Sequence, residues 1–371
     1  MMLSGYRRSD GFVGLRNLLV VASVSDLAND VVLRIAQKVD GAVALLTPTG
    51  GLSVGGELQL ANRLRLALCA NPNVGAVLVV GPTPKDVDGA AASIRENGRS
   101  VDTLSLVDVV DSIRAIGAGR RKAGKLLEEL ASQKRHEVGV DTLRVGVRSS
   151  SSSAESAETV NPLVGKIVDT IVTGGGTVAF TELADIVAAV EPTLGKAACE
   201  KVAHDIRIAL GETRRSLPDL LGEMPDPTPT NILGGLTTLE AKGLASLRRL
   251  GDSNIESVAR FGNPVPNGGL HMIAGPGSAA ISLVGFAAAG CNLVLYTVGM
   301  FSAIAASPLM PAIKFGPSAF AGSEDVDVCV TGTIDFEDVT AKVFSIAAGS
   351  PCAAERSQAR QLTLPSSLAP L

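Results

Sequence analysis

The sequence predicts an α/β protein with two open, mostly parallel α/β domains and helices on both faces of each sheet. Short apolar runs alternate with amphipathic segments of helical length, which is typical of strand–helix–strand crossovers in parallel sheets. Hydrophobic residues make up 46% of the 371 residues but aromatic residues only 3%. Small aliphatic side chains of this kind suit closely packed layers of helix and sheet.

The first domain is expected over residues 1–140. Its strands are predicted over 17–25, 42–47, 71–81 and 101–106, and its helices over 26–39, 57–70 and 85–97. The strand runs are rich in Val and Leu, and the helical segments carry apolar residues at a spacing of three and four. A charged stretch over 126–142 is expected to finish a helix before the domain boundary.

The second domain is expected over residues 141–353. Its strands are predicted over 143–148, 177–182, 269–275 and 291–299, and its helices over 161–176, 239–251, 279–290 and 335–349, with a long helical region ending near 221. The remaining residues, 354–371, are polar and contain proline, so we expect a disordered tail there.

Composition excludes several classes of function. The net charge is −4 and no basic cluster is present, so binding to nucleic acid or to an acidic membrane surface is not expected. Five scattered cysteines without a CxxC pair do not predict a disulfide framework. The first residues lack the apolar segment of a signal peptide and no apolar stretch reads as a membrane span, so a cytoplasmic protein is expected.

Ligands of open α/β sheets bind beyond the carboxyl ends of the strands. The loops expected there span 23–30, 46–57, 81–87, 148–158, 180–186, 274–280 and 297–314. One of them, within LLTPTGGLSVGGELQL (45–60), has the glycines and small polar residues of an active-site loop. It nevertheless contains no Cys, His or Lys.

Several segments resemble the altronate/galactarate dehydratase family, which also includes the large subunit of sulfolactate sulfo-lyase. They are GYRRSDGFVGLRN (5–17), LANDVVLRIA (27–36), ANPNVGAVLVVG (70–81), GGLTTLEAKGL (234–244) and the closing DFEDVTAKVF. The resemblance runs in order over roughly residues 5–350. It implies a metal-dependent lyase, with iron or manganese as the cofactor, that removes water or sulfite from a hydroxy acid.

The chain departs from this family in the loops expected to form the site. Relatives carry reactive side chains where this chain has Thr47, Gly51, Pro84, Lys85, Arg148, Ser149, Ser153 and Met300. The residues replaced are His, Cys, Glu, Asp and Arg, while the framework segments persist. The loop over 45–60 therefore retains the backbone of a reactive site and has lost its reactive side chains.

Three residues are candidates for catalysis: Glu182, His271 and Glu240. Glu182 either faces the site or caps the following helix, and His271 is either a base or a core histidine. Glu240 and Lys242 are two residues apart on a helix, so only one of them is expected to point inward. The candidate substrate-binding residues are Arg7, Arg8, Arg16, Arg148, Ser149, Ser153, Thr47, Gly51 and Lys85.

Alternatives stay open for these residues. The N-terminal arginines either hold a substrate carboxylate, for which a guanidinium is well matched, or form an ion pair that fixes the segment. The serines either hydrogen-bond substrate hydroxyls or form a flexible loop. The three histidines, His136, His204 and His271, show no ligand spacing, so no metal ligands are assigned.

Three functions are compatible with these sequence features. The first is a divergent hydro-lyase that acts on a sugar acid or small hydroxy acid. The second is a non-catalytic homologue that serves as a hydroxy-acid-binding or partner subunit. A third possibility is a different chemistry that uses serine, Lys85 or Lys314. In each case we expect the chain to self-associate or to join a partner subunit.

Overall fold

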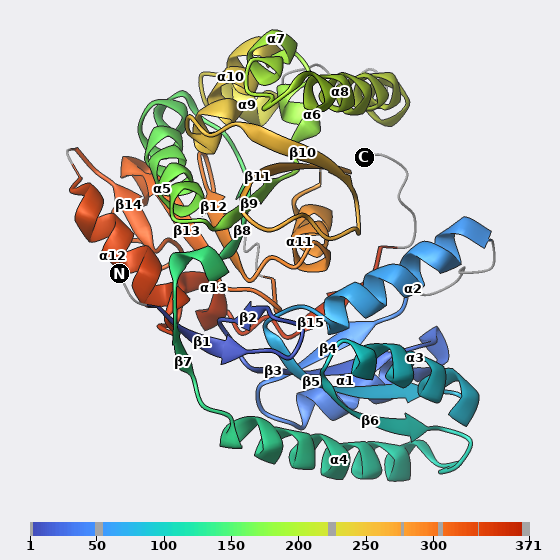
Figure 1. Cartoon of the computed structure of the whole chain (residues 1–371). Helices are drawn as coiled ribbons and strands as arrows, with labels where there is room; N and C mark the ends of the chain where they lie inside the picture. Colours follow the sequence, from blue (N-terminus) through green and yellow to red (C-terminus); the bar gives the residue numbers. More distant parts are fainter. Residues whose placement is uncertain are drawn as a thin grey trace.

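The computed structural model describes residues 3–48, 55–221, 228–275, 278–302, 307–332 and 334–365, with the backbone alone at 55–58 and 216–221. These residues form a five-stranded and a seven-stranded sheet, both parallel throughout, and a small antiparallel sheet (Figure 1). Helices cover both large sheets, which confirms the predicted α/β fold class.

The five-stranded sheet has the order β15-β4-β3-β5-β6. Its strands are β3 (Leu18–Ser23), β4 (Ala42–Leu46), β5 (Val74–Gly81), β6 (Ser100–Ser105) and β15 (Gln361–Thr363). Its helices are α1 (Asn29–Gln37), α2 (Gly55–Cys69), α3 (Pro84–Glu96) and α4 (Ser112–Ser132). Alternate residues of β3 point to opposite faces, so Leu19 and Val21 pack with α1 and α4, whereas Val20 and Ala22 pack with α2 and α3.

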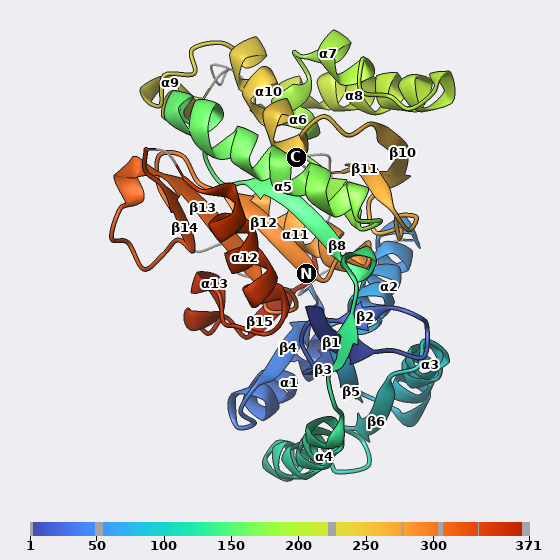
Figure 2. The ribbon, with the colours of Figure 1, turned by 60° about the vertical axis from the view of Figure 1, so that its left-hand side comes forward.

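The seven-stranded sheet has the order β10-β11-β9-β8-β12-β13-β14. Its strands are β8 (Arg144–Ser149), β9 (Thr177–Phe180), β10 (Ile255–Arg260), β11 (Gly269–Ala274), β12 (Leu293–Thr297), β13 (Ala312–Pro317) and β14 (Val328–Val330). Helices α5 (Asn161–Thr173) and α12 (Phe336–Ala347) lie in front of this sheet in Figure 2, and α11 (Ala279–Ala288) lies behind it. Gly146 permits the close approach of α11, because a Cβ there would lie 2.5 Å from the ring of Phe286.

A further group of helices forms a separate layer beside β10 (Figure 1). They are α6 (Leu183–Ile186), α7 (Val190–Leu194), α8 (Glu200–Leu221), α9 (Pro229–Leu233) and α10 (Leu239–Leu247). A 3-10 turn, η4 (Arg248–Leu250), continues directly from α10. This layer covers the carboxyl end of β9 and therefore borders the edge where a ligand is expected.

Buried asparagines join the two large sheets. Asn71 donates to the carbonyl oxygens of Ala287 at 2.9 Å and of Cys291 at 2.8 Å. Asn73 donates to the carbonyl oxygen of Asn292 at 2.9 Å, and the Asn292 amide donates to the carbonyl oxygen of Val13 at 2.9 Å. Each amide satisfies backbone groups that burial between the sheets would otherwise leave without partners.

The end of the chain differs from the predicted disordered tail. Residues Ala353–Arg356 form α13, and β15 pairs in parallel with β4, with Leu362 opposite Leu45. Leu364 is buried and its N–H donates to the carbonyl oxygen of Leu46 at 3.1 Å. The edge of β4 provides unpaired backbone groups, so even a short polar segment gains hydrogen bonds by adding a strand there.

The small sheet lies between the two large ones (Figure 2). It consists of β1 (Leu3–Arg7), β2 (Val13–Gly14) and β7 (His136–Val138), paired antiparallel. Among the described residues, no helix combines the length and apolar character needed to cross a bilayer.

Candidate functional site

A buried ion pair network lies at the carboxyl ends of β8 and β9. Glu182, 4% exposed, follows β9, and its Oε1 atom lies 3.1 Å from Nη1 of Arg148, near the end of β8. Its Oε2 atom accepts a hydrogen bond from Nη2 of Arg249, on η4. The backbone N–H of Ser149 donates to Oε1 at 2.8 Å. One carboxylate therefore binds two guanidinium groups and an N–H.

A second ion pair adjoins this network. Lys242, on α10, lies 2.7 Å from a carboxylate oxygen of Asp185, on α6. Burial alone would raise the pKa of Asp185, but Lys242, Arg148 and Arg249 outweigh burial and lower it. We call Arg148, Glu182, Asp185, Lys242 and Arg249 the ion cluster. Its three cations and two carboxylates leave one positive charge, which favours an anionic ligand.

Several buried polar atoms at this edge have no hydrogen-bond partner within the described ranges. They include Nε and Nη1 of Arg249, whose side chain is fully buried, and the hydroxyl oxygens of Thr181 and Thr297. Thr297 ends β12 and lies opposite Ser149 in the sheet. Buried donors without partners are costly, and a small carboxylate or hydroxyl ligand would satisfy them.

A row of polar side chains extends from the ion cluster across the sheet. Arg148 on β8 lies opposite Tyr296 on β12, and Tyr296 lies opposite Lys314 on β13. All three are buried. Burial raises the pKa of Tyr296 to about 12 and lowers the pKa of Lys314, although Asp325, Asp327 and Cys352 partly oppose the change at the lysine. Lys314 donates to the hydroxyl of Ser302 at 3.2 Å.

The serine-rich loop is held by its own hydrogen bonds. The hydroxyl of Ser149 donates to the carbonyl oxygen of Ser151 at 2.8 Å, and the hydroxyl of Ser151 accepts from the N–H groups of Gly299 and Met300, each at 3.1 Å. Ser153 accepts from the N–H of Ser156 at 3.1 Å at the start of the π-helical turn η3 (Ser156–Val160). Of these serines, Ser149 lies beside the ion cluster.

The N-terminal arginines do not join the ion cluster. Nε of Arg8 donates to the carbonyl oxygen of Pro72 at 2.8 Å, and Arg7 is exposed. Arg16 forms a two-point ion pair with Glu355 of α13, with N···O distances of 2.6 and 2.8 Å. Within the described residues, Arg8 and Arg16 bind backbone carbonyls and the C-terminal segment. These contacts match the alternative in which the arginines fix the N-terminal segment.

The loops of the five-stranded sheet hold the remaining substrate-binding candidates. Thr47, at the end of β4, exchanges hydrogen bonds with Ser23, and its hydroxyl accepts from Nη2 of Arg65 at 3.3 Å. Lys85 is exposed in the first turn of α3, a helix that Thr83 caps. Gly51 lies outside the described residues. The hydrogen bonds of Thr47 therefore stay within its own sheet and helix layer, away from the ion cluster.

Two of the three catalytic candidates, His271 and Glu240, lie outside the ion cluster. His271 is buried on β11, where its Nδ1 pairs with the hydroxyl of Ser257 at 2.9 Å and its Nε2 with the carbonyl oxygen of Gly268 at 2.8 Å. Both ring nitrogens are thus engaged in the core. Glu240 is exposed in the first turn of α10, and Lys242 is instead the inward member of the pair. Residues two apart lie on different helix faces, so only one of them reaches the cluster.

The donor set does not fit the divalent metal that the resemblance implies. Throughout the described ranges, no three His, Cys, Asp or Glu side chains lie close enough together to hold a metal ion. The edge where a ligand is expected carries Arg148, Ser149 and Arg249, and a guanidinium repels a cation.

Sequence reasoning found Arg148, Ser149 and Glu182 but missed Arg249 and Asp185. Arg249 lies in LASLRRLG, which reads as the basic end of an exposed helix. The two adjacent arginines of η4 could have indicated an inward guanidinium, because adjacent residues of a helical turn point in different directions. Arg248 is exposed, whereas Arg249 points inward to Glu182.

Comparison with known proteins identifies the family. The profile described as D-galactarate/altronate dehydratase, C-terminal, matches residues 140–368, and that of the second domain of D-galactarate dehydratase/altronate hydrolase matches residues 5–131. The (2R)-sulfolactate sulfo-lyase subunit beta of Chromohalobacter salexigens is 28% identical over 339 residues, which cover 89% of this chain and 86% of that protein.

Two altronate dehydratases are similarly related. Those of Bacillus subtilis and Escherichia coli are each 28% identical, over 313 and 309 residues. The matches cover 80% and 79% of this chain but only 62% of each dehydratase, so the chain spans less than two thirds of their length. The two profiles together extend over both large sheets, and the chain therefore belongs to the D-galactarate/altronate dehydratase family.

Proposed function

We propose that the chain is a divergent hydro-lyase that removes water from a sugar acid or small hydroxy acid. The observation that carries this proposal is the ion cluster at the carboxyl edge of the seven-stranded sheet. It holds one excess positive charge, and the Nε and Nη1 donors of Arg249 have no partner among the described residues. Family membership supports the reaction class. The ligand class follows from the cluster itself, since guanidinium donors match a carboxylate.

In this proposal Arg249 and Arg148 hold the carboxylate of the acid, and Glu182 keeps both guanidinium groups in place. A neighbouring positive charge makes the α-proton of the bound acid more acidic, because it stabilises the enolate that forms. Arg249 is fully buried, so the acid enters through a local opening, and association is slower than a diffusion-limited encounter.

Lys314 is the proposed general base. Burial lowers its pKa, which increases the fraction of neutral amine near neutral pH. The amine takes the α-proton, the β-hydroxyl leaves, and the ammonium so formed returns the proton to the departing hydroxide as water. The enol that remains tautomerises to a 2-keto-3-deoxy acid, so atoms and charge balance.

The test combines product detection with a matched pair of variants. Altronate, galactarate and sulfolactate are incubated with the protein, and loss of water or sulfite is followed by mass spectrometry. Lys314→Met is expected to reduce kcat by about 100-fold or more, the range of a lost general base, with little change in acid affinity. Lys125→Met, which changes an exposed lysine on α4, is the control. The proposal is refuted by a protein that neither binds nor converts any of the three acids.

A second candidate function is a subunit that binds a hydroxy acid without converting it. The resemblance implies that Arg148, Ser149 and Ser153 replace acid and thiol side chains of the family, which favours this reading, and one relative is named as a subunit beta. Saturable acid binding without turnover, unchanged by added iron or manganese, would support it. We also propose that the chain works in an assembly, and a monomer mass by light scattering would argue against that.

A further inference from the structure

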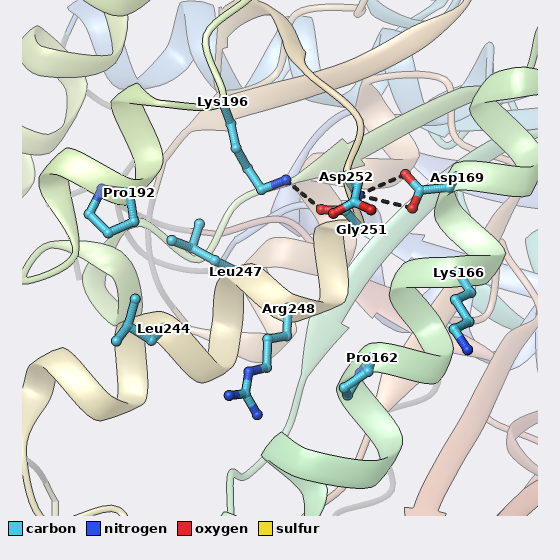
Figure 3. A pocket seen from close by; sticks show the side chains of 10 residues that line it. All are labelled: Pro162, Lys166, Asp169, Pro192, Lys196, Leu244, Leu247, Arg248, Gly251 and Asp252. Carbon is cyan, nitrogen blue, oxygen red and sulfur yellow. Dashed lines mark hydrogen bonds between the residues drawn. The ribbon is translucent and has the colours of Figure 1, made fainter.

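A hollow lies against η4, and Glu182 is not among the residues that line it. It has a volume of about 570 Å³ and lies between α5, α7, α10 and the turn after η4 (Figure 3). This volume falls in the range of roughly 300–1,000 Å³ that is typical of small-molecule sites. None of the ion cluster residues lines it.

The walls of this cavity are apolar. Pro162, Pro192, Leu244 and Leu247 line it, and the side chains project from three different helices in Figure 3. Leu244 is 42% exposed, which is unusual for a leucine whose neighbours on α10 are buried. An apolar ligand group would remove this leucine from water.

Cations border the apolar walls. Lys166, Lys196 and Arg248 line the cavity together with two acids. One of these acids, Asp169, is occupied by the turn that follows η4, because it accepts hydrogen bonds from the N–H of Asp252 at 2.9 Å and from the hydroxyl of Ser253 at 2.6 Å. The border therefore has one excess positive charge. An amphipathic anion would match this cavity, with its apolar part against the leucines and prolines and its negative charge against the lysines and Arg248.

The turn η4 belongs to both sites. Arg248 lines the cavity, and the next residue, Arg249, binds Glu182 in the ion cluster. Gly251 ends the turn with a φ of 62°, and a Cβ there would lie 2.3 Å from the Asp169 carboxylate. Lys196 also donates to the carbonyl oxygen of Gly251. Groups from the cavity thus hold the turn that positions Arg249.

We propose that this cavity binds a small monocarboxylate with an apolar chain, and that the bound molecule restrains η4 and thereby the ion cluster. The carboxylate lies against Lys166 and Arg248, and the chain lies against Leu244 and Leu247. Because the two sites share a turn with no other element between them, restraint at Arg248 reaches Arg249 through one peptide bond. The binding claim does not depend on catalysis.

Octanoate is the probe, titrated into the full chain by calorimetry. We expect saturable binding with a Kd on the order of 1 mM, as for a small ligand of modest efficiency. Leu244→Glu places a carboxylate in the wall and is expected to weaken binding at least tenfold. Leu233→Glu changes another exposed leucine, 77% exposed and outside the cavity, and is expected to leave binding within twofold. Lys166→Glu provides a second variant at an exposed position.

Two further measurements separate the cavity from the ion cluster. Arg249→Met should change octanoate affinity far less than the tenfold expected for Leu244→Glu, because Arg249 does not line the cavity and reaches it only through the shared turn. Hydrogen exchange of the Ser149 N–H, which donates to Glu182, should slow when octanoate binds. Absence of saturable binding, equal binding by Leu244→Glu, or loss of binding in Arg249→Met instead would overturn the assignment of the site. Unchanged exchange at Ser149 with binding intact would overturn the restraint of the cluster.

Discussion

Replacing Arg249 with Met tests whether the ion cluster recognises an acid. Methionine retains a long apolar side chain in a fully buried position but removes the two donors, Nε and Nη1, that have no partner in the described structure. Glu182 keeps Arg148 and the N–H of Ser149 as partners, so the substitution does not leave an isolated buried charge. One hydrogen bond from a charged donor to a carboxylate contributes about 1.5–3 kcal/mol. Loss of one such bond corresponds to roughly 10- to 150-fold weaker binding.

Calorimetric titration with altronate measures this loss, and circular dichroism confirms that the variant is folded. Arg248→Met is the matched control, since it removes the adjacent arginine, which is exposed and contacts the carbonyl oxygen of Ala157 instead of Glu182. We expect a tenfold or greater increase in Kd for Arg249→Met and less than a twofold change for Arg248→Met. Equal affinities of the two variants for altronate would refute the role of Arg249 in acid recognition.

Three further results are expected. Burial lowers the pKa of His271 below its ordinary value of 6.5, so the unfolded chain takes up a proton first and stability falls as the pH drops below 6.5 until the folded-state pKa is passed; His271→Gln should flatten this dependence in urea titrations. Glu355→Ala breaks the two-point ion pair with Arg16 and should lower the free energy of unfolding by about 1–2 kcal/mol, with faster proteolysis within 357–365 as the readout. Protein purified without oxygen should contain far less than stoichiometric iron or manganese by elemental mass spectrometry, and a full equivalent would mean that the ligands include residues outside the described ranges.

Local patterns were sufficient for the fold class. Val74–Gly81 is a β-branched run between two helical segments, and every large-sheet pairing in the structure is parallel. The strand in the C-terminal segment was harder to predict from sequence, because a three-residue strand such as Gln361–Thr363 has no periodicity to detect. Its partner is β4, more than 300 residues earlier, and the pairing depends on an edge that only the folded sheet provides.

The site could be predicted in part. Glu182 follows β9 and Arg148 lies near the carboxyl end of β8, where a general rule for α/β sheets places ligands. The arginines of the N-terminal signature were harder to interpret, because a sequence does not reveal which backbone carbonyls converge on a guanidinium. Arg8 binds such carbonyls, and Arg249 depends on a turn whose direction the tertiary packing sets.

The pairing of β15 with β4 also fixes an order of events during biosynthesis. β4 ends at Leu46 and β15 begins at Gln361, so at ribosomal rates of about 5–20 residues per second the first sheet waits on the order of 15–60 s for its last strand. During that interval the edge of β4 exposes backbone N–H and C=O groups that other chains can bind. The nascent protein thus exposes an unpaired strand edge at its oldest sheet for most of translation, and a chaperone that shields this edge would act throughout that interval.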